Sequence, residues 1–168
     1  MPVNDVLLPG RHNLENIAAA WAVALAAGWS VTHCANAVTR FPGLPHRCEW
    51  VAEIDGVRFY NDSKGTNVGA TVAAIAGLAG ANKNIVLIAG GDGKGADFTA
   101  LADSVHQHVR HMVLIGRDAN QIAEACHLSA VTFVNSIQLA VQRAAEIAEA
   151  GDIVLLSPAC ASFDMFTG

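Results

Sequence analysis

The stretch that decides the predicted fold is IVLIAGGDGKGADF, residues 85–98 of a 168-residue chain. Five apolar residues pass directly into a loop that holds four glycines, and a helical pattern follows. An apolar run of this length is typical of a strand that is buried on both faces of a parallel sheet. Residues 112–115, 131–134 and 153–156 are similar runs. The chain therefore contains four candidate parallel strands.

Helical patterns separate these strands, at residues 68–78, 98–109, 119–126 and 137–150. Short helical crossovers require a parallel sheet, so we predict a doubly wound, Rossmann-like α/β fold. An antiparallel hairpin is expected before it, because residues 51–54 and 57–60 flank Asp55-Gly56, a dipeptide that tolerates the positive φ angles of a two-residue turn. The sheet is therefore expected to be mostly parallel, with one antiparallel hairpin at its start.

The amino-terminal part is predicted to be helical. Residues 12–28 form an alanine-rich pattern that ends at Gly28, and Ser30 is placed to cap a second helix. The apolar run 17–29 is shorter than the roughly 20 residues that cross a bilayer, so we expect a buried helix there. Two prolines and a glycine in residues 41–45 interrupt regular structure. We therefore divide the chain into domains 1–41 and 42–168.

Composition limits the class of function. Fifteen acidic against ten basic side chains give a formal charge of −5, and 52% of the residues are hydrophobic. These values are typical of a soluble globular protein without the positive field that binds nucleic acid or an anionic membrane. The first residues do not resemble a secretory signal, so we expect a cytoplasmic protein. The expected partner is a small molecule or another protein.

No metal site is predicted. His106, His108 and His111 are interpreted as a solvated helix end, because His106 and His108 point to different faces of a helix. The cysteines form no Cys-x-x-Cys pair, which favours reduced packing residues. They are Cys34, Cys48, Cys126 and Cys160.

Three loops could carry chemistry, and the first is residues 61–67, between a strand and a helix. Its backbone N–H groups and Lys64 suit an anionic ligand at the positive end of a helix. The alternative is that Thr66 or Asn67 caps the helix and that Lys64 is solvated.

The second loop is residues 90–97. It is not a phosphate-binding P-loop, because no Ser or Thr follows Lys94 to hold magnesium. Residues 91–96 do match the dinucleotide pattern G-x-G-x-x-A, with Asp118 after the next strand as a candidate ribose ligand. An NAD(P)-binding oxidoreductase domain is therefore one alternative.

The third loop, residues 157–164, follows the last strand and is rich in small residues. We interpret Ser162 as a hydrogen-bond donor and Cys160 as a buried thiol rather than a nucleophile. His46-Arg47, after the proline-rich segment, fits either a hinge contact or a phosphate clamp.

Together these segments resemble the Mur ligase family, in the branch that adds D-glutamate. The similarity covers nearly the whole chain, and the loop at residues 61–67 is its most discriminating part. It is carried by Gly10-Arg-His-Asn13-x-x-Asn16, His46-Arg47-x-Glu49, Asn61-Asp-Ser-Lys64-x-Thr66-Asn67, Gly90-Gly91-x-x-Lys94-Gly95-x-Asp97 and Leu156-Ser-Pro-Ala-Cys-Ala-Ser162-Phe-Asp164.

The resemblance implies an ATP-dependent ligase of peptidoglycan synthesis. In such an enzyme ATP phosphorylates the carboxylate of UDP-N-acetylmuramoyl-L-alanine, and the amine of D-glutamate attacks the acyl phosphate. Residues 1–41 would be the closing helices of a central ATPase domain, and residues 42–168 an amino-acid-binding domain that lacks its end. We therefore expect a carboxyl-terminal piece whose partners are the amino-terminal and central domains.

The resemblance also implies site residues. Lys64, Thr66, Lys94 and Ser162 match positions that bind D-glutamate. The matching nucleotide positions are Asn13, Asn16, His46, Arg47 and Asp62. ATP and Mg²⁺ are expected for the full-length enzyme and no cofactor for this piece, which has no P-loop and no catalytic residue and is expected to be inactive. A non-catalytic α/β interaction module is a further alternative.

Overall fold

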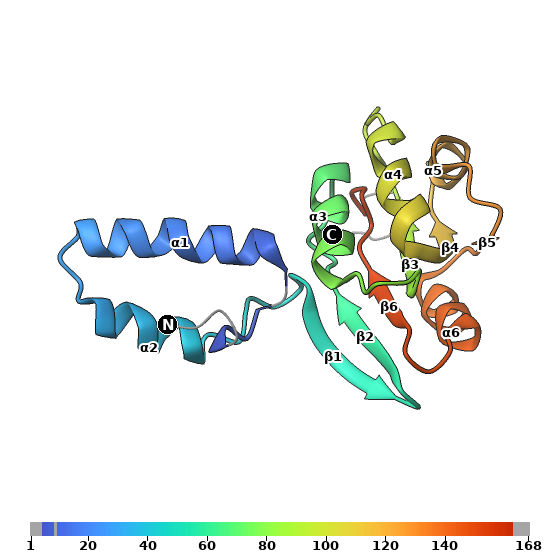
Figure 1. The fold of residues 1–168 in the computed structure, drawn as a ribbon. Helices are drawn as coiled ribbons and strands as arrows, with labels where there is room; N and C mark the ends of the chain where they lie inside the picture. Colours follow the sequence, from blue (N-terminus) through green and yellow to red (C-terminus); the bar gives the residue numbers. More distant parts are fainter. Residues whose placement is uncertain (1–4, 9, 163–168) are drawn as a thin grey trace. The chain divides into compact units, whose positions relative to one another are not determined.

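The computed structural model describes residues 5–8 and 10–162 and separates into two compact units, residues 1–45 and 46–168. The first unit is a pair of helices, α1 (Arg11–Ala26) and α2 (Val31–Arg40) (Figure 1). Ser30 caps α2 as predicted, because its side chain accepts a hydrogen bond from the His33 N–H at 3.2 Å.

The expectation that residues 17–29 form a buried helix is wrong. Val23 on α1 is 71% exposed, and Trp29, just after the helix, is 63% exposed. Within the described part of this unit α1 has one other helix, α2, to pack against, and a two-helix pair leaves most of each helix surface in contact with solvent. The run is apolar in composition but is not enclosed.

The second unit contains a six-stranded sheet whose strand order is β1-β2-β6-β3-β4-β5. The first two strands are antiparallel, and the other neighbours are parallel. The strands are β1 (Glu49–Ile54), β2 (Val57–Asn61), β3 (Ile85–Gly90), β4 (Val109–Ile115), β5 (Val131–Phe133) and β6 (Ile153–Leu156). The helices between them are α3 (Val68–Leu78), α4 (Thr99–His108), α5 (Ala119–Cys126) and α6 (Ile137–Ile147).

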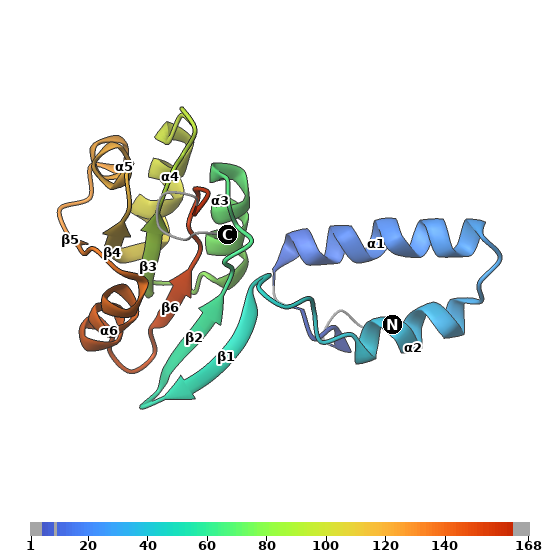
Figure 2. The ribbon, with the colours of Figure 1, turned by 180° about the vertical axis from the view of Figure 1, so that it is seen from behind.

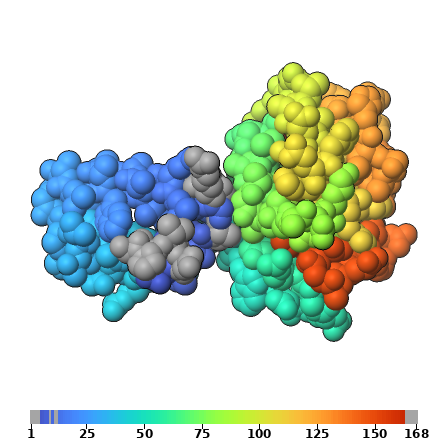
Figure 3. Space-filling view, in the orientation of Figure 1, coloured from blue at the N-terminus to red at the C-terminus, as the bar shows by residue number. Residues whose placement is uncertain are grey.

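Two hydrophobic layers cover the sheet. In β3, Ile85 and Leu87 face the core shared with α3, α4 and α5, whereas Val86 and Ile88 face the core shared with α6. Because successive strand residues point to opposite faces, an uninterrupted apolar strand fills both layers. Helices therefore pack on both faces (Figures 1 and 2), and Figure 3 shows α3 and α4 as neighbours on one side. The predicted doubly wound α/β fold is confirmed.

The hairpin turn also has the predicted chemistry. Asp55 and Gly56 both have positive φ, 52° and 77°, and they join β1 to β2. A positive φ costs glycine nothing and aspartate little, so this dipeptide fixes the turn locally.

The histidine-containing end of α4 differs from its prediction. The helix ends at His108, and His111 lies in β4, where its Nε2 is 2.9 Å from Thr132 Oγ1. His106 is on the helix, with its Nε2 2.6 Å from the Cys126 carbonyl oxygen. The solvated-end interpretation is therefore wrong for His111, because the apolar strand begins directly at Val109. Across the described residues, no group of three His, Cys, Asp or Glu side chains has a metal-binding arrangement, and no helix is long and apolar enough to span a membrane.

Candidate functional site

The three loops singled out from the sequence follow three neighbouring strands. Residues 61–67 begin at the last residue of β2, residues 90–97 begin at the last residue of β3, and residues 157–162 follow β6, which lies between the other two strands. Ligands of doubly wound sheets bind beyond the carboxyl ends of the strands. The strand order therefore places all three loops at the edge where a ligand is expected.

Backbone hydrogen bonds join the central loop to both others. The Ala159 N–H donates to the Gly65 carbonyl at 2.8 Å on one side. On the other, the Gly90 N–H donates to the Pro158 carbonyl at 2.8 Å. Residues 157–162 are thus held from both directions, and the three loops form one connected edge.

A buried polar network lies beneath the contact with the first loop. The hydroxyl of Ser157, which is fully buried, donates to Oδ2 of Asp62 at 2.7 Å and is 2.9 Å from Oγ1 of Thr71. The other oxygen of Asp62 accepts the Cys48 N–H at 3.1 Å. Burial and the neighbouring Asp62 carboxylate raise the pKa of the Cys48 thiol to about 12, so it stays protonated at neutral pH. The network fixes the base of the first loop.

The first loop itself presents polar side chains above this network. Lys64 and Thr66 are exposed, and Asn67 caps α3 by accepting the Ala70 N–H at 2.9 Å. The helix is therefore capped by Asn67, and capping does not account for Thr66.

His46 and Arg47 adjoin the first loop. The Lys64 N–H donates to the His46 carbonyl at 3.1 Å, and Nδ1 of His46 is 2.9 Å from the side-chain amide of Asn61. His46 and Arg47 are both exposed, whereas Asp62 is only 6% exposed. Asn13 and Asn16 lie on α1 in the first unit, so their role stays a prediction.

The glycine-rich loop is joined to the third loop by a small antiparallel bridge. The Asp92 N–H donates to the Ala161 carbonyl at 2.8 Å, and the Ala161 N–H donates back at 2.9 Å. At Gly91, φ is +127° and a Cβ atom would overlap the same Ala161 carbonyl. Only glycine allows this close approach without displacing the third loop. The bridge lies next to exposed Ser162, whereas Asp164 is outside the described residues.

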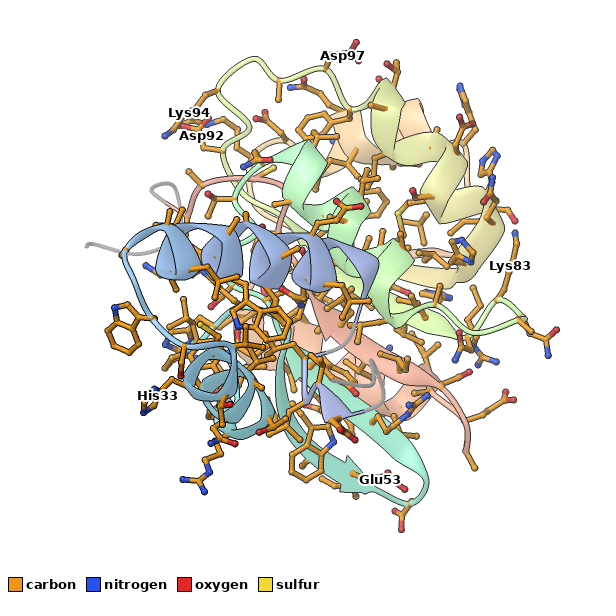
Figure 4. All side chains as sticks on the ribbon, turned by 60° about the vertical axis from the view of Figure 1, so that its left-hand side comes forward. His33, Glu53, Lys83, Asp92, Lys94 and Asp97 are labelled. Atoms are coloured by element: carbon orange, nitrogen blue, oxygen red, sulfur yellow. The ribbon has the colours of Figure 1, made fainter. Side chains whose placement is uncertain are left out.

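Lys94 is held in an unusual conformation on that loop. Its φ is +53°, in the left-handed region, and its N–H donates to Oδ1 of Asp92 at 2.9 Å. The second oxygen, Oδ2, pairs with Arg117 at 3.0 Å. Figure 4 shows Lys94 and Asp92 next to each other on the loop, with Asp97 further along it. The Lys94 side chain is exposed at the same edge as the other loops.

Asp118 is explained by this loop rather than by a ribose. Its Oδ2 accepts the Gly93 N–H at 2.7 Å, its Oδ1 accepts from Gln121 at 2.8 Å, and the residue is 7% exposed. These contacts give Asp118 a structural role in the glycine-rich loop, so the residue is not evidence for the NAD(P)-binding alternative.

Sequence reasoning missed four supporting residues: Ser157, Thr71, Asp92 and Arg117. The spacing of Asp92 two residues before Lys94 is a usable signal, because Asp side chains often accept a hydrogen bond from the backbone two residues on. The contacts of Ser157 with Asp62 and Thr71 have no such local signal.

Comparison with known proteins agrees with this architecture. Residues 46–160 match the family model described as "Mur ligase, glutamate ligase domain". A UDP-N-acetylmuramoylalanine–D-glutamate ligase of Legionella pneumophila is 54% identical over 168 residues, which is 99% of this chain and 38% of that protein. The ligase of the same name from Methylobacillus flagellatus is also 54% identical and is 36% covered.

A solved structure extends the comparison to the fold. The UDP-N-acetylmuramate–alanine ligase of Thermotoga maritima superposes with a TM-score of 0.71 at 16% identity, over 92% of this chain and 36% of that one. The chain thus spans little more than a third of the proteins that it matches. The matched model and the 54% identity together establish that this chain belongs to the Mur ligase family.

Proposed function

We propose that this chain forms the acceptor-binding part of an ATP-dependent ligase that joins D-glutamate to UDP-N-acetylmuramoyl-L-alanine in peptidoglycan synthesis. The main support is the meeting of three loops at one sheet edge, with two lysines and two hydroxyl side chains exposed on them. The names of relatives that are 54% identical over nearly the whole chain point to the same acceptor.

The chemistry of D-glutamate fits these side chains. The amino acid has two carboxylates, and charge-assisted hydrogen bonds from ammonium and hydroxyl groups hold carboxylates well. We assign this role to Lys64, Thr66, Lys94 and Ser162. With both carboxylates held, the amine can be oriented toward the acyl phosphate, where it forms the C–N bond, loses a proton and displaces phosphate.

The nucleotide would approach from the side of His46 and Arg47. Arg47 supplies a guanidinium for phosphate oxygens, and Asp62 supplies acceptors for the ribose hydroxyls. The Asp62 carboxylate already accepts hydrogen bonds from Cys48 and Ser157. Two carboxylate oxygens offer about four acceptor positions, so capacity for a further donor remains. We also assign Asn13 and Asn16 a nucleotide-binding role, on the resemblance alone.

In this proposal ATP supplies the phosphoryl group, and Mg²⁺ neutralises negative charge on its phosphates. The chain contains no Gly-Lys-Ser or Gly-Lys-Thr sequence, so its residues do not provide a P-loop for the phosphates. We therefore place the P-loop and the magnesium ligands outside these 168 residues. The chain alone should neither hydrolyse ATP nor form the amide.

The first unit fits the role of closing helices of an ATPase domain, residues 1–41, followed by the amino-acid-binding domain, residues 42–168. The exposed apolar side chains of Val23 and Trp29 support this assignment, because helices that end a larger domain bury such groups against the rest of it. A cytoplasmic location follows from the nucleotide substrates.

The test is a hybrid ligase in which this chain replaces the matching segment of the Legionella pneumophila relative. Phosphate release should require D-glutamate together with UDP-N-acetylmuramoyl-L-alanine, and L-glutamate should not substitute. The chain alone, measured in parallel, should release no phosphate. A hybrid that releases phosphate equally with another amino acid would contradict the assignment of the acceptor.

A further inference from the structure

We propose that Asp92 is a positioning residue that sets Lys94 and Ser162 in register for the acceptor. The inference deepens the proposed function, because it concerns the same acceptor site. It rests on the placement of one aspartate at the junction of three segments: the glycine-rich loop, the third loop and the loop that follows β4.

Every polar group of Asp92 has a defined partner. Its backbone N–H and carbonyl exchange hydrogen bonds with Ala161, one residue before Ser162. Its Oδ1 accepts the Lys94 N–H at 2.9 Å, and its Oδ2 accepts from Nη1 of Arg117 at 3.0 Å. The backbone of Asp92 therefore sets the third loop while its side chain sets Lys94.

The hydrogen bond between the Asp92 side chain and the Lys94 N–H stabilises the backbone conformation of Lys94. Left-handed backbone is unfavourable for a residue with a Cβ and persists where surrounding contacts over-determine it. The carboxylate of Asp92 satisfies the Lys94 N–H in this conformation, and the guanidinium of Arg117 holds that carboxylate in place. Removing the carboxylate should let the Lys94 backbone relax and move its ammonium group away from the acceptor.

The same loop provides a matched control. Asp97 makes the same local hydrogen bond, from the Thr99 N–H to its Oδ1 at 2.9 Å, but at the start of α4. Figure 4 shows Asp97 away from the Asp92–Lys94 pair. Asp97→Ala therefore removes an equivalent contact without touching Lys94.

The experiment measures the KM values of the hybrid ligase for D-glutamate and ATP. Asp92→Ala should raise the KM for D-glutamate about 10-fold, the equivalent of one charge-assisted hydrogen bond, while the KM for ATP stays within about twofold. Asp92→Asn keeps an acceptor for the Lys94 N–H and should recover part of the loss. Asp97→Ala should leave the KM for D-glutamate within about twofold. Equal changes for D-glutamate and ATP, or none, would overturn the positioning role.

A second measurement uses the 168-residue chain without any ligand. In two-dimensional NMR spectra, Asp92→Ala should shift the amide signal of Lys94, Asp92→Asn should shift it less because an acceptor is kept, and Asp97→Ala should leave it unchanged. A Lys94 signal that Asp92→Ala leaves unshifted, or that both Asp92 variants shift equally, overturns the inference, whatever the hybrid does. A hybrid that never responds to D-glutamate contradicts the proposed function instead, and the spectra then decide the positioning role alone.

Discussion

Replacement of Ser157 by alanine should destabilise the second unit strongly, although the two side chains differ by a single oxygen atom. The change removes one hydroxyl that is fully buried, donates to Asp62 Oδ2 at 2.7 Å and lies 2.9 Å from Thr71 Oγ1. A hydrogen bond to a charged group contributes about 1.5–3 kcal/mol and a neutral one about 0.5–1.5 kcal/mol. Since both partners stay buried, the expected loss in the free energy of unfolding is about 2–4 kcal/mol.

The assay is urea unfolding of the chain, followed through the NMR amide signals of β3 and β6. These signals report on the second unit alone, which matters because two units need not unfold together. Ser162→Ala, on the same loop but exposed, is the control and should change the free energy of unfolding by less than about 0.5 kcal/mol. A loss below about 1 kcal/mol in Ser157→Ala would refute the reasoning, because the buried carboxylate would then not depend on this donor.

Three further predictions concern the same edge. Lys94→Ala in the hybrid ligase should lower kcat/KM for D-glutamate by the equivalent of about 1.5–3 kcal/mol, and Lys83→Ala, before β3, should not change it. Gly91→Ala should cost more than about 2 kcal/mol in urea unfolding, because its Cβ would strike the Ala161 carbonyl, whereas Gly95→Ala meets no atom within 4 Å and should cost only the strain of a positive φ. The raised pKa of Cys48 means that the folded state keeps a proton that the unfolded state loses near pH 9. The free energy of unfolding should therefore fall as pH rises from about 9 toward 12, and urea titrations should show a smaller fall in Cys48→Ala.

The parts of the fold that sequence predicts well are those with a local cause. The turn at Asp55-Gly56 is fixed by the φ preferences of two residues, and strands β3 and β6 by uninterrupted apolar runs. The three candidate loops are predictable because polar or glycine residues come at the ends of β2, β3 and β6. Each of these inferences needs no information from distant parts of the chain.

The parts that sequence does not predict depend on distant contacts. Insertion of β6 between β2 and β3 puts residues 157–162 in the centre of the site, and no local pattern encodes this order. The hydrogen bonds from Ser157 to Asp62 and Thr71 span 95 and 86 residues. The exposure of α1 is likewise set by how few helices surround it rather than by its composition.

The candidate site combines a buried hydrogen-bonded network with exposed lysine side chains. Buried Ser157 is hydrogen-bonded to buried Asp62 and Thr71, whereas Lys64 and Lys94 are exposed. A ligand that binds loose loops pays to order them, so fixing the backbone beforehand leaves only side-chain freedom to be lost. The same fixing explains why a non-glycine residue can stay left-handed at position 94: relaxing that backbone would break its bond to Asp92. The strain of a left-handed Lys94 is therefore offset by its hydrogen bond to Asp92 and by the pairing of Asp92 with Arg117.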